Sequence, residues 1–188
     1  MPFTFEPTEL PGVVMVRPRV FGDSRGHFFE SFRQSHFLAG SIPGEFVQDN
    51  QSRSVRGTVR GLHFQRGEHA QGKLVRCLVG EICDVAVDIR PGSATFGQWV
   101  ARALSGEDHA MLYVPPGFAH GFQVVTAEAE VLYKCTTEYA PDHEGGIMWN
   151  DPDLAIAWPV ADALVSEKDA RNPSWAQFCG LVRDDLRV

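Results

Sequence analysis

The stretch KLVRCLVGEICDVAVDIR, from Lys73 to Arg90, alternates apolar residues with polar or small ones. A period of two residues is typical of β-strands, because successive side chains point to opposite faces. Near its end one face is apolar and the other carries two aspartates, with Cys83, Val85, Val87 and Ile89 set against Asp84, Ala86 and Asp88. Charged residues are mostly exposed, so this parity predicts that Asp84 is solvated on the outside of the sheet.

The same alternation recurs in short segments separated by Gly, Pro and Asp residues, which favour turns. These segments are residues 12–21, 98–105, 109–117, 120–125 and 129–139. Their spacing predicts an all-β barrel or sandwich. Helical signals are few: one short helix is expected before Gly40 within residues 24–40, and a second within residues 173–182. Residues 141–159 are expected to form a long ordered loop.

Length and composition limit the classes of protein to which the sequence can belong. A chain of 188 residues with 44% hydrophobic content is expected to form one globular domain over residues 1–188. The formal net charge of -7 and the absence of a basic stripe argue against a nucleic-acid partner. The sequence shows neither a basic, apolar leader nor an apolar run of membrane length, so a cytoplasmic location is predicted, with no membrane partner. The four cysteines form no CxxC pair and are expected to be reduced thiols.

Arg60 and His63 stand out in the segment VRGLHFQ, which otherwise resembles a half-buried strand. In a regular strand the two side chains would point to opposite faces. Gly61 lies between them and tolerates a bulge, which could turn both toward one cavity. A guanidinium and an imidazole in a strand are explained if that strand lines a polar cavity.

Histidines inside a β-barrel are compatible with two kinds of chemistry, a metal site or acid/base catalysis on a bound organic substrate. Metal-binding cupin barrels typically carry a His-x-His pair, a glutamate and a later histidine after Pro-x-Gly. The segment PPGFAH supplies the later histidine, His120, but His63 is followed by Phe64 and Gln65. A metal triad is therefore incomplete, and acid/base catalysis is the favoured interpretation.

Two tyrosines lie on one face of the segment EVLYKCTTEY. If it is one strand, Tyr133 and Tyr139 are roughly 20 Å apart at about 3.3 Å per residue. A sugar nucleotide could lie between them. The alternative is that both rings pack in a core with their hydroxyl groups hydrogen-bonded.

Several ordered stretches resemble the dTDP-4-dehydrorhamnose 3,5-epimerase family, and they span nearly the whole chain. They are DSRGHFFESF (23–32), VQDNQSRSVRGTVRGLHFQ (47–65), residues 73–99, PPGFAHGF (115–122), residues 131–159 and SEKD (166–169). The resemblance implies a cupin-like jelly-roll barrel with a few short helices. It also implies a homodimer that acts on a dTDP-4-keto-6-deoxy sugar without a metal or redox cofactor.

The resemblance also assigns catalytic residues. A 4-keto group acidifies the hydrogens on the neighbouring carbons, so epimerisation needs a base, a group that stabilises the enolate oxygen and an acid on the other face. His63 is implied as the base, Asp169 as its hydrogen-bond acceptor, Lys73 as the partner of the oxyanion and Tyr133 as the acid. A second polar pair, Asp84 and His120, is expected to orient Lys73 or the sugar.

Substrate-binding residues follow from the same matching positions. They are Arg25, Glu30, Gln48, Asp49, Asn50, Arg60, Glu144 and Lys168, and Tyr139 is implied as the ring that stacks on thymine. Arginine suits a diphosphate because its planar fork donates two hydrogen bonds at once. Arg25 and Glu30 are expected to act across a dimer interface.

The expected reaction is epimerisation at C3 and C5 of dTDP-4-dehydro-6-deoxy-D-glucose. The residues leave three alternatives open: an epimerase acting only at C3 or C5, a 3,4-ketoisomerase, and a non-catalytic nucleotide-sugar binding protein.

Overall fold

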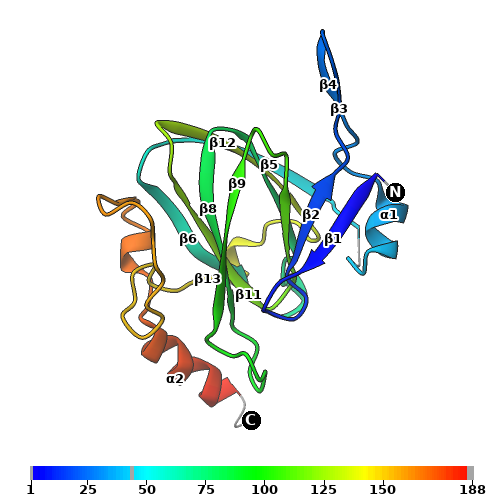
Figure 1. Cartoon of the computed structure of the whole chain (residues 1–188). Coiled ribbons are helices and arrows are strands. Elements are labelled where there is room, and N and C mark those ends of the chain that lie inside the picture. Colours follow the sequence, from blue (N-terminus) through cyan, green and yellow to red (C-terminus); the bar gives the residue numbers. More distant parts are fainter. Residues whose placement is uncertain (1, 43–44, 186–188) are drawn as a thin grey trace.

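The computed structural model describes residues 2–42 and 45–185 and consists mainly of antiparallel β-sheet (Figure 1). The first sheet has the strand order β1-β2-β10-β7-β12-β5, and the second has the order β13-β6-β11-β8-β9 with β14 parallel to β6. The first sheet consists of β1 (Phe3–Pro7), β2 (Val14–Pro18), β10 (Met111–Val114), β7 (Lys73–Val79), β12 (Glu128–Cys135) and β5 (Gln48–Val55). The second consists of β13 (Glu144–Gly146), β6 (Thr58–Gln65), β11 (Phe118–Val124), β8 (Glu81–Asp88), β9 (Trp99–Ser105) and β14 (Leu164–Val165).

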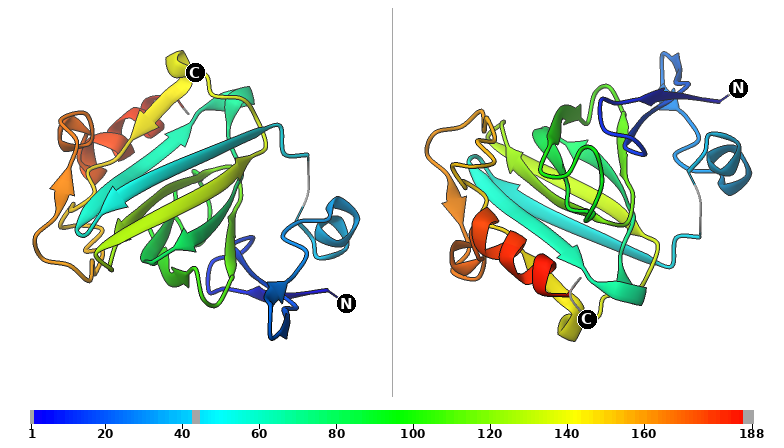
Figure 2. Two further views of the ribbon diagram at one scale, coloured as in Figure 1. Left: turned by 90° about the horizontal axis from the view of Figure 1, so that it is seen from above. Right: turned by 90° about the horizontal axis from the view of Figure 1, so that it is seen from below.

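Helices are short and lie outside the two sheets. They are α1 (Gln34–Ala39), α2 (Trp175–Asp185) and three 3-10 turns, η1 (Gly67–His69), η2 (Pro141–His143) and η3 (Asp169–Arg171). Views from above and below show α1 with the N-terminal strands on one side and α2 on the other (Figure 2). Within the described ranges, no helix is long and apolar enough to cross a membrane. The all-β prediction is confirmed, and both expected helices are present.

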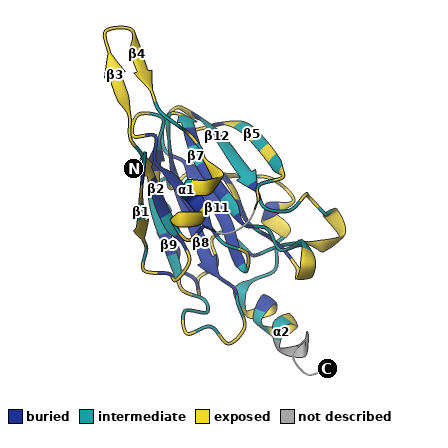
Figure 3. Cartoon of the chain, turned by 90° about the vertical axis from the view of Figure 1, so that its right-hand side faces the viewer, coloured by how far each residue is buried: buried dark blue, intermediate teal, exposed yellow. Residues whose placement is uncertain are grey.

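Residues 24–40 contain less helix than their pattern allowed. A two-stranded hairpin, β3 (Phe21–Asp23) and β4 (Gly26–Phe28), occupies the first part of this segment, and the helix begins only at Gln34. The hairpin projects away from the barrel and is exposed along its length (Figure 3). Because it packs against little of its own barrel, its structure is determined mainly by its own strand pairing.

Apolar side chains form a core between the sheets and cover both outer faces. The inner cluster includes Val75, Ile82 and Ala86. A second cluster, built around Val85 and Val87, lies on the outer face of the second sheet and includes side chains of α2. The expectation that Asp84 is solvated is therefore wrong: its side chain is fully buried, because α2 covers the face that carries Val85 and Val87 and Asp84 points into the barrel.

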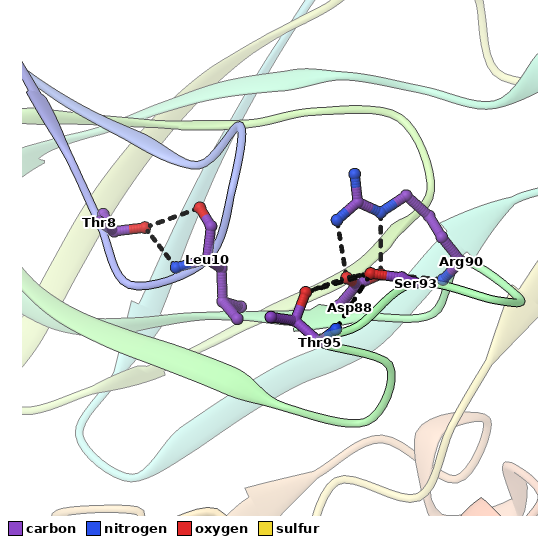
Figure 4. A network of polar contacts seen from close by, with 6 residues as sticks. All are labelled: Thr8, Leu10, Asp88, Arg90, Ser93 and Thr95. Carbon is purple, nitrogen blue, oxygen red and sulfur yellow. Dashed lines mark hydrogen bonds and ion pairs between the residues drawn. The ribbon is translucent and has the colours of Figure 1, made fainter.

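The end of β8 is held by a buried carboxylate (Figure 4). Asp88 accepts hydrogen bonds from Arg90 Nε at 2.9 Å, Arg90 Nη2 at 2.7 Å, and the hydroxyl groups of Ser93 and Thr95 at 2.6 Å each. Burial works to raise the pKa of Asp88, but these hydrogen bonds outweigh it, so the pKa lies well below its usual range. The ionised carboxylate thus stabilises the turn between β8 and β9.

We expect Asp88→Asn to lower the free energy of unfolding by about 2 kcal/mol at neutral pH, because the amide keeps the shape but loses the charge that three side chains bind. The folded-state pKa is depressed below the ordinary 3.8. The stabilisation is therefore complete above the unfolded pKa and is lost as the pH falls toward the folded pKa. Denaturant unfolding of both proteins should show a difference in the free energy of unfolding that becomes smaller below about pH 4. The exposed Asp153→Asn is the control, and equal stability of Asp88→Asn and wild type at pH 7 would contradict the argument.

Candidate active site

Two adjoining cavities lie between the sheets and share three side chains, His63, Lys73 and Tyr133. Their volumes are about 230 Å³ and 370 Å³. Together they fall within the size range of small-molecule sites. We call them the smaller and the larger cavity. The three shared residues therefore lie at the centre of one composite site.

Strand β6 brings Arg60 and His63 to this site through an irregularity at Gly61. Pairing with β11 changes register between His63 and Arg60, and both side chains line the larger cavity. Gly61 has a φ of +143°, and a Cβ there would lie 2.6 Å from the Cα of Gly121. Only glycine fits this conformation and this close approach. The predicted irregularity at Gly61 is confirmed, and it explains how two residues three apart reach one cavity.

His63 is hydrogen-bonded to a carboxylate far away in the sequence. Its Nε2 lies 2.6 Å from Oδ1 of Asp169, which is buried at the start of η3. Burial works to raise the pKa of Asp169, but the hydrogen bond and the charge interaction with His63 outweigh it, so the pKa is lowered. The carboxylate thus stays ionised, fixes the tautomer of the imidazole and leaves Nδ1 as the proton acceptor.

Lys73 and Tyr133 come from the first sheet, opposite His63. Burial of the ammonium group lowers the pKa of Lys73, and the charge interactions with Cys135, Asp84 and Glu144 oppose this effect. Among the described residues, the Lys73 ammonium has no hydrogen-bond or ion-pair partner. Burial also raises the pKa of Tyr133, which keeps its phenol protonated. The site thus holds an unpaired cation and a neutral proton donor facing an imidazole.

A second histidine–carboxylate pair lies at the wall of the larger cavity. His120 lines the larger cavity, and its Nε2 lies 2.8 Å from Oδ1 of Asp84. Oδ2 of Asp84 is buried and has no hydrogen-bond partner among the described residues. Asp84 itself does not line either cavity. The structure therefore brings the expected pair together but places only His120 within reach of a ligand.

Tyr139 lies on a loop and not on a continuation of β12, which ends at Cys135. The expected single strand through residue 139 is therefore wrong, because the chain turns after Cys135. Tyr139 nevertheless lines the smaller cavity, and its hydroxyl group donates to Glu144 Oε2 at 2.8 Å. The same oxygen accepts a hydrogen bond from Lys168 Nζ at 2.6 Å. Burial works to raise the pKa of Glu144, but these two partners outweigh it and lower the pKa.

Strand β5 contributes two of its three expected residues. Gln48 and Asn50 line the smaller cavity. Asp49 lies between them and by strand alternation points to the opposite face, where Lys134 Nζ binds it at 2.8 Å. Asp49 therefore does not line the cavity, contrary to expectation.

Arg25 and Glu30 lie away from both cavities of their own chain. Arg25 lies in the turn of the β3–β4 hairpin, with 88% of its side chain exposed, and pairs with Asp23. Glu30 follows the hairpin and pairs with Arg33. Neither residue can contact a ligand bound between the sheets of the same chain.

The sequence interpretation missed several cavity residues, including Gln65, Gln71, Ser52 and Ser166. Gln65 could have been found, because it lies two residues after His63 and shares its face of β6. The two serines carry no comparable signal. Within the part of the chain that the structure describes, no group of three or more His, Cys, Asp or Glu side chains is arranged to hold a metal ion.

Two facing β-sheets with a polar cavity between them define this protein as a cupin-like jelly-roll protein. A family model described as dTDP-4-dehydrorhamnose 3,5-epimerase matches residues 7–177. The chain belongs to this family.

Similar proteins agree with that membership. The dTDP-4-dehydrorhamnose 3,5-epimerase of Pseudomonas aeruginosa is 56% identical over 169 residues, covering 89% of this chain and 93% of the relative. A 3,5-epimerase structure from Legionella pneumophila, in complex with dTDP-4-keto-L-rhamnose, has a TM-score of 0.89 and 45% identity, covering 94% of this chain and 96% of that one. A 3'-monoepimerase from Streptomyces bikiniensis, in complex with dTDP-quinovose, has a TM-score of 0.88 and 34% identity, covering 94% and 90%.

The sequence has only three lysines, so the opposite pKa shifts of Lys73 and Lys168 can be tested directly. The pKa of Lys73 is lowered by burial, whereas that of Lys168 is raised by its hydrogen bond to Glu144. After reductive methylation with ¹³C-formaldehyde, we expect the Lys73 resonance to titrate at lower pH than the Lys168 resonance. Lys73→Met assigns the signal by removing it. A Lys73 signal that titrates with or above Lys168 would contradict the assigned environment.

Proposed function

We propose that this protein epimerises dTDP-4-dehydro-6-deoxy-D-glucose at C3 and C5, giving dTDP-4-dehydro-L-rhamnose without a cofactor. One observation carries the proposal. The His63 imidazole, hydrogen-bonded to Asp169, and the Tyr133 phenol line the same cavity from opposite sheets, with the unpaired Lys73 ammonium between the two cavities. Membership of the epimerase family supports the same reaction.

The first chemical step is removal of a proton next to the 4-keto group. Nδ1 of His63 takes the proton from C5 or C3, and the electron pair of the broken C–H bond moves into the carbonyl to form an enolate. Asp169 stabilises the resulting imidazolium. The Lys73 ammonium stabilises the enolate oxygen more strongly than the ketone, because the negative charge develops in a poorly hydrated cavity.

Inversion follows from the placement of the proton donor. Tyr133 lies on β12 of the first sheet, whereas His63 lies on β6 of the second. A sugar ring between the sheets therefore has the base on one face and the phenol on the other. Tyr133 donates its proton to the carbon as the enolate collapses back to the ketone, and the configuration at that carbon inverts. Proton transfer from His63 to water and from water to Tyr133 then restores both groups for the next step.

Binding of the nucleotide end is assigned to residues around the two cavities. Tyr139 stacks on the thymine in the smaller cavity, next to Gln48 and Asn50. Arg60, in the larger cavity, donates to the diphosphate, and its Nε is oriented by Ser54 Oγ at 3.0 Å. The reaction is expected to take place in the cytoplasm, as the sequence predicts.

Proton exchange tests the proposed reaction. In deuterated water with dTDP-4-keto-6-deoxyglucose, we expect NMR to show loss of the C3 and C5 hydrogen signals. His63→Asn should slow exchange about 10³-fold, because the base is removed, while dTDP binding is retained. His36→Asn on α1, outside both cavities, is the matched control.

Other results of the proton-exchange experiment would indicate a different activity. Exchange at one carbon, with the keto group still at C4, would make this chain a single-site epimerase, like the 3'-monoepimerase of Streptomyces bikiniensis. No exchange at either carbon, with dTDP bound, would reject the epimerase and favour a binding protein. Loss of the C3 hydrogen with the keto group moved to C3 would instead indicate a ketoisomerase, because that reaction also removes the C3 proton. Full activity of His63→Asn would reject His63 as the base.

We further infer that the protein is a homodimer in which Arg25 and Glu30 of one copy complete the site of the other. The support is the position of the hairpin, which projects from the barrel (Figure 1) and exposes Phe21 by 51% and Phe28 by 68%. Large exposed aromatic side chains on a projecting hairpin are suited to burial against a second copy.

Coexpression of two inactive variants tests whether Arg25 of one copy acts in the site of the other. A mixed dimer of Arg25→Ala and His63→Asn has one site with an intact base and an intact arginine from the partner. With random assembly, about a quarter of wild-type activity should appear, because half of the dimers are mixed and each has one working site. Activity no higher than that of the separate variants would show that Arg25 does not act across an interface.

A further inference from the structure

Gln65 is a buried residue at the end of β6, two positions after His63, and its side-chain amide binds the loop that carries Tyr139. Its Oε1 accepts a hydrogen bond from the backbone N–H of Ala140 at 2.7 Å. Its Nε2 donates to the carbonyl groups of Glu138 at 3.2 Å and His69 at 2.8 Å. The residues on both sides of Tyr139 are therefore fixed to the strand that carries the proposed base.

The amide of Gln65 has no donor left for a ligand, although the side chain lines the smaller cavity. A glutamine amide has two N–H donors, and two backbone carbonyls take both. Gln65 therefore cannot donate a hydrogen bond to a nucleotide without releasing the loop. Its effect on binding must pass through the residues that it holds.

Tyr139 is held from the other sheet as well. Its backbone N–H donates to Oε1 of Gln48 at 2.8 Å, and Nε2 of Gln48 donates to Asn50 Oδ1 at 3.0 Å. Three consecutive backbone positions, residues 138–140, are thus bound by two glutamine amides, one from each sheet. The ring is fixed at its far end by Glu144, which pairs with Gln65 across β13 and β6.

Fixing this loop reduces the conformational entropy lost when a ligand stacks on the ring. Tyr139 is 51% exposed and has little packing of its own to hold it. An exposed loop without such bonds would sample many orientations, and binding would have to order it. The hydrogen bonds of Gln65 order the loop before the ligand arrives.

We propose that Gln65 is a positioning residue for the nucleotide-binding ring, setting the orientation of Tyr139 relative to the strand that carries His63. This inference rests on the proposed function, in which Tyr139 stacks on thymine. It predicts that loss of the Gln65 amide weakens nucleotide binding while the chemical step is preserved.

Gln65→Leu tests the role by separating binding from chemistry. We expect the Kd for dTDP, measured by calorimetry, and the KM for the keto sugar both to rise about tenfold, with kcat changed by less than about threefold. A residue that only stabilised the fold would lower the melting temperature without this split between KM and kcat.

Gln123→Leu is the matched control, because Gln123 is a buried glutamine that binds another loop in the same way. Its Nε2 donates to the Val160 carbonyl at 2.8 Å, and its Oε1 accepts from the Val160 N–H at 2.9 Å. This variant should lose stability but keep the wild-type Kd for dTDP.

Gln65→Glu provides a second test with the shape retained: it keeps the acceptor for Ala140 and loses both donors, so dTDP binding should weaken as in Gln65→Leu.

A double variant shows whether Gln65 acts through Tyr139. In a Tyr139→Ala background, adding Gln65→Leu should weaken dTDP binding by less than about twofold, because the ring that it positions is absent. Wild-type dTDP affinity in both Gln65 variants would overturn the positioning role but not the proposed function. A full additional tenfold loss of dTDP affinity in the double variant would do the same. Failure of the unsubstituted protein to bind dTDP would instead overturn the proposed function together with this inference.

Discussion

The close contact between the backbones of β6 and β11 at Gly61 and Gly121 determines which side chains of β6 reach the cavity. No side chain fits between these strands, since a Cβ on Gly61 would lie 2.6 Å from the Cα of Gly121. The register shift at this contact turns Arg60 and His63 toward one cavity. The N–H of Gly61 also lies 3.4 Å from Oδ2 of Asp169, so the same irregularity helps to hold the carboxylate beside His63. A regular strand here would point Arg60 and His63 to opposite faces of the sheet.

Charged groups in the described part of the barrel differ in whether they are paired with a group of opposite charge or a histidine. Asp169 and Asp84 are each hydrogen-bonded to a histidine, whereas the ammonium of Lys73 has no such partner among the described residues. Burying an unpaired charge costs free energy, and the lowered pKa of Lys73 reflects that cost. In the proposed reaction the enolate oxygen becomes the missing partner. The destabilised ammonium therefore favours the charged intermediate over the neutral substrate.

Alternation of residue types was sufficient to predict the strands, but it did not show which faces of a strand meet water. Both faces of β8 are covered, one by the opposite sheet and one by α2, so Asp84 is buried although its parity suggested a solvated residue. Parity also failed beyond Cys135, where a turn ends β12 before Tyr139. The partnership of His63 with Asp169 joins residues 106 positions apart and has no local signal, so only the family resemblance indicated it. Gln65, in contrast, shares the parity of His63 and is predictable from it.

Epimerisation at two carbons does not require two sets of catalytic groups in the proposed mechanism. C3 and C5 flank the same carbonyl, so removal of a proton from either carbon places the negative charge on the same oxygen, and one Lys73 serves both steps. His63 and Tyr133 lie on opposite sheets and can act on whichever carbon lies between them. The number of carbons inverted then depends on how freely the sugar turns within the cavity while the nucleotide stays bound at Tyr139. This dependence explains why single-site and double-site epimerases can share one fold, and why His63, Tyr133 and Asp169 alone do not distinguish them.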